Sequence, residues 1–177
     1  MTEGTKSYLI GCHQFLLHPL WVLLAWRLEY KSWPKWWEII CISLHDIGIC
    51  GRQYLSDDKA KNGHWERGAF LSWRIFARLD RLQKRKDCLG GQAYKLCAGH
   101  TKETQLSFHE SRLFRADKRS WLVAPIWWLW CNYWVEWQGR GLGVTPPPLW
   151  RELVAENLKR DNPIDSHELY MINRREG

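Results

Sequence analysis

The stretch that decides the fold runs from Pro34 to Gly48 and reads PKWWEIICISLHDIG. Proline is favoured in the first turn of a helix, and Ser32 stands near the expected cap. The apolar residues that follow recur at helical spacing, and Gly48 can end the helix in a left-handed turn. The sequence therefore predicts a helix from Pro34 to about Asp46, with His45 and Asp46 in its last turn.

Apolar residues recur at helical spacing in most other segments, and no runs of strict alternation bounded by turn residues indicate a sheet. We therefore expect an all-α fold, a single compact helical bundle with a long Trp-rich helix and a short C-terminal helix. Five other helices are expected. One begins at Pro19, and a long one begins near Ser111 and bends at Pro125. The remaining three cover Trp65 to Leu82, Tyr94 to His100, and Leu149 to Lys159. The double glycine Gly90-Gly91 predicts a turn.

Composition bounds the class of protein. A chain of 177 residues can bury a core without disulfides, and many of its fourteen tryptophans are expected there. The net charge of +7 suits nucleotides, nucleic acid or an acidic membrane surface without choosing between them. The six cysteines form no CxxC pair and no signal peptide precedes them, so we expect reduced thiols and a cytoplasmic protein. The apolar stretches 15–26 and 121–137 are interrupted by proline and polar residues, which argues against stable membrane insertion.

The pair His45-Asp46 is the most informative feature for chemistry. Imidazole and carboxylate together suit a borderline divalent metal such as Zn, Mn, Fe or Co, and such an ion needs further ligands from elsewhere in the chain. Histidines and an acid beside apolar segments supply the candidates. They are His18 at the mouth of the first long helix, His64 after a polar loop, His100 at a helix end, and Asp117.

The order of these residues resembles the pattern of the HD superfamily of metal-dependent phosphohydrolases. The likeness covers roughly residues 13 to 135, and its segments are HPLWV at 18–22, LHDIG at 44–48, HWERGA at 64–69, His100, and SRLFRADK at 111–118. Many members carry Lys directly after the His-Asp-Ile-Gly run, whereas Ile49 stands there in this chain. The resemblance implies an HD-type hydrolase domain over residues 1–137. Residues 138–177 would then form a linker, a short helix and a polar tail that packs on this domain or trails it.

The resemblance also implies the roles of the site residues. His18, His45, Asp46 and Asp117 would bind one divalent ion, which is Zn, Mn, Co, Fe or Mg. The two remaining histidines, His64 and His100, would bind a second ion or the substrate phosphate. A bound ion lowers the pKa of water and polarises a phosphoryl oxygen.

The remaining roles concern the reacting water and the substrate. Asp46 would also accept a hydrogen bond from the attacking water, as the catalytic carboxylate. Arg52, Lys118 or Lys102 could hold phosphate oxygens.

The expected function is hydrolysis of a phosphate ester in a nucleotide-like small molecule by a metal-activated water. One alternative is an HD-type di-iron oxygenase, because two extra histidines permit a second metal. Another is a non-catalytic module that binds nucleic acid or a membrane surface, with nucleic acid less favoured than a small substrate. A homo-oligomer is compatible with the sequence. All of these hydrolase expectations require the imidazole of His45 and the carboxylate of Asp117 to meet at one centre.

Overall fold

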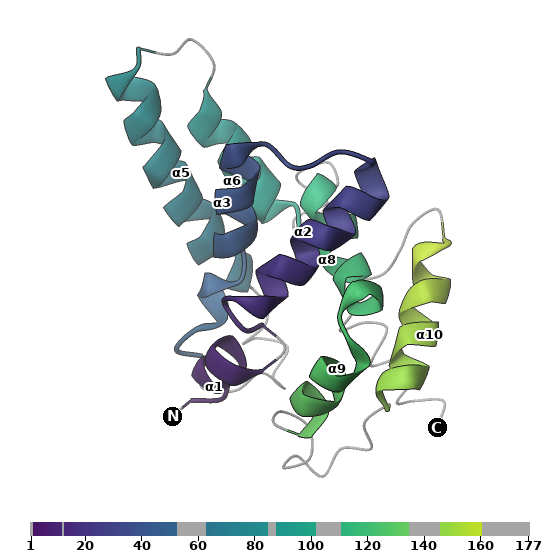
Figure 1. Cartoon of the computed structure of the whole chain (residues 1–177). Helices are drawn as coiled ribbons and strands as arrows, with labels where there is room; N and C mark the ends of the chain where they lie inside the picture. Colours follow the sequence, from purple (N-terminus) through teal and green to yellow (C-terminus); the bar gives the residue numbers. More distant parts are fainter. Residues whose placement is uncertain are drawn as a thin grey trace.

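The computed structural model describes residues 2–11, 13–52, 63–84, 88–101, 111–134 and 146–160. These residues form helices and turns and no strand, which confirms the all-α class (Figure 1). The elements are α1 (Glu3–Ile10), α2 (Leu17–Tyr30), α3 (Trp36–Leu44), the 3₁₀ turn η1 (Ile47–Ile49), α5 (His64–Leu82), α6 (Leu89–Ala98), α8 (Arg112–Val123), α9 (Ile126–Asn132) and α10 (Pro147–Leu158).

The bundle is built from two helix pairs that meet around α3. Helix α5 packs along α6, helix α2 packs along α8, and α3 contacts α2, α5 and α6 (Figure 1). The main core lies where they meet, and its largest fully buried side chains include Trp26, Ile42, Phe76 and Leu113. Truncating a core residue of this size costs about 2–5 kcal/mol. The core therefore holds α2, α3, α5 and α8 in fixed relative positions.

Helix α2 begins at Leu17, so the prediction that it starts at Pro19 with His18 outside it is wrong. The side-chain oxygen of Gln14 accepts a hydrogen bond from the backbone N–H of Leu17 at 2.6 Å and stabilises an earlier start. Pro19 then lies within the first turn, where its missing N–H costs no intrahelical bond. His18 is therefore helical and buried.

Both ends of α3 differ from the prediction. The helix begins at Trp36 after Lys35, whose N–H donates to the Glu38 carboxylate at 2.6 Å, and Ser32 takes no part in the cap. It ends at Leu44, so that His45 is its C-cap and Asp46 follows it.

Gly48 does not adopt a left-handed conformation but lies in η1. A Cβ at Gly48 would meet the backbone oxygen of His64 at 1.7 Å, so glycine is required there for close packing of η1 against the start of α5.

Two further boundaries correct the sequence analysis. Gly90 and Gly91 belong to the first turn of α6 rather than to a turn before it, and the N–H of Gly90 donates to the Asp80 carboxylate of α5 at 2.9 Å. At Pro125 the expected single bent helix is two helices, α8 and α9. The guanidinium of Arg151 in α10 donates to the carbonyl of Ala124 at this break.

The tryptophans do not share one environment. Trp26, Trp128 and Trp150 are buried, whereas Trp127 and Trp134 are 58% and 55% exposed, so the Trp-rich segment is only partly core. Helix α10 packs on α8 through Trp150. The expected boundary at 137/138 lies outside the described residues.

No helix within the described ranges has both the length and the apolar character needed to span a membrane. The described cysteines carry free thiols.

Candidate metal centre

Six side chains from five parts of the fold meet at the centre of the bundle. His18 comes from the first turn of α2, His45 and Asp46 from the end of α3, and Asp117 from the middle of α8. His64 is the first residue of α5, and His100 directly follows the end of α6. Since the core fixes these helices against one another, it also fixes the separations between their ligand atoms.

The first half-site consists of His18, His45, Asp117 and the Oδ2 atom of Asp46. The Nε2 atoms of His18 and His45 each lie 3.2 Å from Asp46 Oδ2. They lie 3.2 Å and 3.6 Å, respectively, from Asp117 Oδ1. The imidazole of His45 and the carboxylate of Asp117 therefore do meet.

The second half-site consists of His64, His100 and the other carboxylate oxygen of Asp46, Oδ1. The Nε2 atoms of His64 and His100 lie 3.2 Å apart. They lie 4.0 Å and 3.6 Å from Asp46 Oδ1. Asp46 thus stands between the two half-sites, with one oxygen directed to each.

Hydrogen bonds to the far side of the ring orient two of the histidines, His45 and His100. Nδ1 of His45 lies 2.6 Å from the carbonyl of Ile42, and Nδ1 of His100 lies 2.5 Å from the carbonyl of Cys97. A carbonyl accepts only from an N–H, so each neutral ring carries its proton on Nδ1 and presents the Nε2 lone pair to the centre. Lys118 binds Asp117 Oδ2 at 2.9 Å, which leaves Oδ1 directed to the histidines.

The donor atoms fit a divalent cation. The Nε2 atoms of His18 and His45 are buried, and neither has a hydrogen-bond partner of acceptable geometry among the described residues, although carboxylate oxygens lie close by. Two ligands bonded at about 2.1 Å to one ion lie about 3.0 Å apart in octahedral and about 3.4 Å apart in tetrahedral geometry. The 3.2–3.6 Å separations of the first half-site match this requirement.

Charge and burial act against each other in the first half-site. Burial alone would lower the pKa of His18 and His45, but the carboxylates of Asp46 and Asp117 outweigh it, so both histidine pKa values are raised. Burial alone would raise the pKa of Asp46, but the adjacent histidines hold it well below its usual range. The pKa of Asp117 is also held well below its usual range, mainly by Lys118. Both carboxylates are therefore ionised, as metal ligands must be.

The expected substrate contacts are less uniform. Lys118 is buried and ion-paired with Asp117, so it supports a ligand rather than facing solvent. Arg52 stands after η1, where its Nε donates to the carbonyl of Gly48 at 3.0 Å. Lys102 lies outside the described residues. His64 is the most accessible member of the centre, with 20% of its side chain exposed.

Two residues near the centre were missed by the sequence analysis. The ring of His13 lies 6.0 Å from that of His18, and its Nδ1 lies 2.9 Å from Ser7 Oγ. Burial and the charge of Asp46 raise the pKa of Tyr8, which places this phenol in the field of the same carboxylate. His13 precedes α2, which begins at Leu17, so its ring reaches that of His18 from the turn before the helix.

The comparisons with protein-family models, curated proteins and solved structures gave no match for this chain. The buried His/Asp cluster is therefore interpreted on its own geometry. Two groups within it, His18-His45-Asp117 and His45-Asp46-His100, bring one ligand atom per residue within 4.8 Å of one another.

Proposed function

We propose that this chain is a metal-dependent phosphohydrolase of HD type. His18, His45, Asp46 and Asp117 would hold one divalent ion, and His64, His100 and Asp46 a second. The proposal is carried by one observation: Asp46 directs one oxygen to each of two adjacent sets of histidine nitrogens. A carboxylate in this position suits two neighbouring cations, an arrangement common in enzymes that cleave phosphate esters.

The chemistry supplied by a bound divalent ion is a lowered pKa of water and a polarised phosphoryl oxygen. Asp46 stays ionised because its pKa is depressed, so it accepts a hydrogen bond from the attacking water rather than storing its proton. Lys118 offsets one of the two carboxylates, so the loaded centre carries net positive charge and attracts a phosphate. His64, the accessible member, would be the first of these residues that an entering substrate meets.

The test is turnover by the purified chain loaded in turn with Mn, Zn, Co, Fe or Mg. The substrates are p-nitrophenyl phosphate, bis-p-nitrophenyl phosphate and a panel of nucleotides. We expect hydrolysis of a member of this panel, and loss of both activity and bound metal in His45→Ala and Asp46→Asn. Asp80→Ala is the matched control, because Asp80 binds the Gly90 N–H away from the centre. Metal-loaded protein that cleaves none of these substrates would overturn the proposal.

The two adjacent half-sites also support a second candidate, a di-iron oxygenase. Four histidine nitrogens and one Asp117 oxygen around the shared Asp46 carboxylate suit iron as well as manganese or zinc. Elemental analysis separates the two functions. Two irons per chain with oxygen-dependent turnover favour the oxygenase, and hydrolysis with redox-inert zinc favours the phosphohydrolase.

A further inference from the structure

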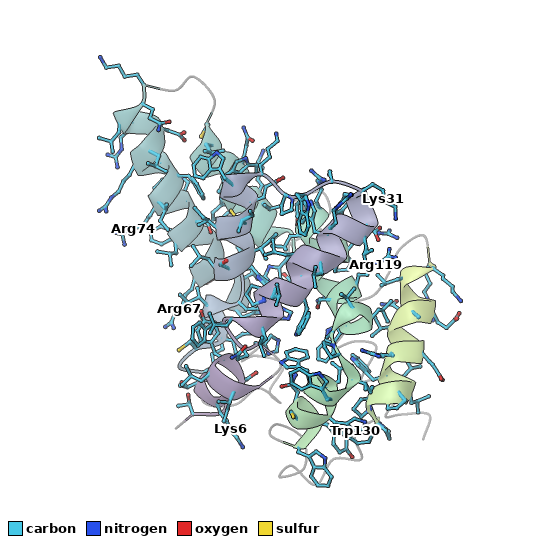
Figure 2. All side chains as sticks on the ribbon, in the orientation of Figure 1. Lys6, Lys31, Arg67, Arg74, Arg119 and Trp130 are labelled. Carbon is cyan, nitrogen blue, oxygen red and sulfur yellow. The ribbon has the colours of Figure 1, made fainter. Side chains whose placement is uncertain are left out.

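The outer face of α5 carries a continuous basic stripe. Its members are Arg67, Phe70, Arg74, Arg78 and Arg81, all exposed, and we call them the α5 stripe. At about 100° per residue they fall within about 80° of arc around the helix axis. Figure 2 shows Arg67 and Arg74 projecting from the same outer side of α5. The five side chains therefore present one surface.

The charges of this stripe are not neutralised by carboxylates. Within the described part of the chain, none of its arginines forms an ion pair. The arginines of α8 differ, since Arg115 and Arg119 pair with Glu29. Two acids adjoin the stripe in sequence: Asp80 is directed to the N–H of Gly90, and the exposed Glu66 forms no ion pair with a described residue. The α5 stripe thus has positive charge available for an anionic partner.

Aromatic rings lie among and beside these charges. The ring centroids of Phe70 and Trp73 lie 5.5 Å apart, and the guanidinium carbon of Arg74 lies 5.9 Å from the ring centroid of Phe70. An open hollow of about 380 Å³ adjoins them, lined by Phe70, Trp73, Gly91, Tyr94 and Lys95. Exposed rings interleaved with arginines suit bases that stack and phosphates that pair.

The stripe is also continuous with the candidate metal centre. Helix α5 begins at His64, the accessible member of that centre, and Arg67 follows less than one turn later. The guanidinium of Arg67 donates to the carbonyl of Cys50, just after η1. A strand that follows the stripe toward the start of α5 would thus arrive beside His64.

We propose that the α5 stripe and its hollow bind single-stranded nucleic acid and lead it to the metal centre. This inference rests on the proposed function and narrows its substrate to a phosphodiester within a strand. A single strand is favoured over a duplex because only unstacked bases can reach Phe70, Trp73 and the hollow. A membrane is disfavoured because an interfacial helix keeps a separate apolar face for lipid, whereas the apolar face of α5 is packed on α3 and α6.

The length of the stripe sets the length of the bound strand. From His64 to Arg81 the helix rises about 26 Å at about 1.5 Å per residue. At about 3.4 Å per nucleotide, the spacing along one strand of a duplex, this distance accommodates at most about seven nucleotides, and fewer when the bases are unstacked. Affinity should therefore increase with oligonucleotide length and level off by about eight.

The experiment is fluorescence anisotropy of the full chain, as purified, with labelled oligothymidylates of 2, 4, 8 and 16 nucleotides. A 16-base-pair duplex and phosphatidylcholine vesicles with phosphatidylserine are measured beside them. The variant R74A/R78A/R81A removes three stripe charges, and K6A/R27A/R160A removes three exposed charges elsewhere as its matched control. Thermal melting confirms that each variant folds.

We expect the stripe variant to bind the 16-mer at least about tenfold more weakly than the wild-type chain. The slope of log K against the logarithm of salt concentration should become about 2 less steep. Phe70→Ala and Trp73→Ala should each weaken binding about fivefold or more without changing that slope. The control variant should match wild type.

Three results would overturn the inference: no oligonucleotide binding, equal loss in the control variant, or duplex or vesicle binding as strong as single-strand binding. Turnover of the full substrate panel by the metal-loaded wild-type chain is measured in parallel. Turnover without strand binding refutes the α5 surface alone. Strand binding without turnover of any panel member refutes the proposed function and delivery to the centre, and leaves the strand-binding surface standing.

Discussion

The two half-sites share Asp46 but differ in burial and in the number of their donors. In the first, His18 and His45 expose 5% and 1% of their side chains, and four residues converge on one point. In the second, only His100 is fully buried, and His64 stands at the edge with 20% exposed. One set of candidate ligands is thus built into the core, whereas the other opens toward solvent. We therefore expect a tightly held first ion and a more weakly held second ion.

The largest effect is expected from the residue that both half-sites share. Asp46→Asn keeps the shape of the side chain but removes the charge on both oxygens. Loss of a group that only orients a ligand costs about 10–100-fold in metal affinity, so loss of the shared ligand should exceed a hundredfold for both ions. Elemental analysis after dialysis should find no bound metal, whereas Asp80→Ala retains it. Retention of either ion in Asp46→Asn would show that the half-sites are independent.

A pair of histidine variants separates the half-sites. His18→Ala should reduce the affinity for the first ion about a hundredfold or more, because it removes one of four buried donors. His64→Ala should release the second ion and leave the first in place. Isothermal titration with Mn²⁺ measures both affinities. If His64→Ala weakened both ions equally, the distinction between a core site and an edge site would be wrong.

Gly48 couples the two half-sites through the backbone. A Cβ there would meet the His64 carbonyl at 1.7 Å, so Gly48→Ala must displace either η1 or the start of α5. We expect Gly48→Ala to lower the free energy of unfolding by about 1–3 kcal/mol. It should also reduce the affinity for the second ion more than the affinity for the first.

Gly91→Ala is the control for Gly48→Ala. Gly91 is a helical glycine, and a Cβ added there would lie 3.1 Å from the sulfur of the Cys88 side chain and near no backbone atom outside its own helix. Alanine is the better helix former, so that variant should be neutral or stabilising. Urea unfolding and metal titration check both variants. An unchanged stability in Gly48→Ala would show that the two segments are not coupled there.

Parts of this centre could be predicted from the sequence because they depend on local pattern. The His45-Asp46 pair stands at the end of an apolar helical run, and a helix end can direct adjacent side chains to one point. The resemblance to the HD superfamily implied which other residues would join it. The helical class followed from the spacing of apolar residues.

Other features depend on contacts that no local pattern contains. Gly48 is required by the backbone of His64, and the break at Ala124 is held by Arg151 from α10. These two tertiary interactions override propensity at helix ends, where the expected boundaries were wrong. The early start of α2 has a local cause instead, the Gln14 side chain three residues before Leu17, which the prediction did not use.

A test of the buried first half-site that needs no substitution is its dependence on pH. The depressed pKa values of Asp46 and Asp117 stabilise the metal-free fold above about pH 4, the ordinary carboxyl pKa, and this stability is lost as pH falls through the folded values. The raised pKa values of His18 and His45 stabilise it below about pH 6.5, and this stability is lost as pH rises through their folded values.

The metal-free chain should therefore melt at lower temperature as pH rises from 6 to 9. Metal ligation requires neutral imidazoles and displaces these protons, so the affinity for the first ion should rise about tenfold per pH unit for each proton released. Melting curves with EDTA or Mn²⁺, and titrations in buffers of different ionisation enthalpy, measure both trends. A first-ion affinity that stays constant between pH 6 and 8 would mean that His18 and His45 are already neutral without metal. In that case the carboxylates would not hold charge on the buried histidines, and burial would decide their protonation.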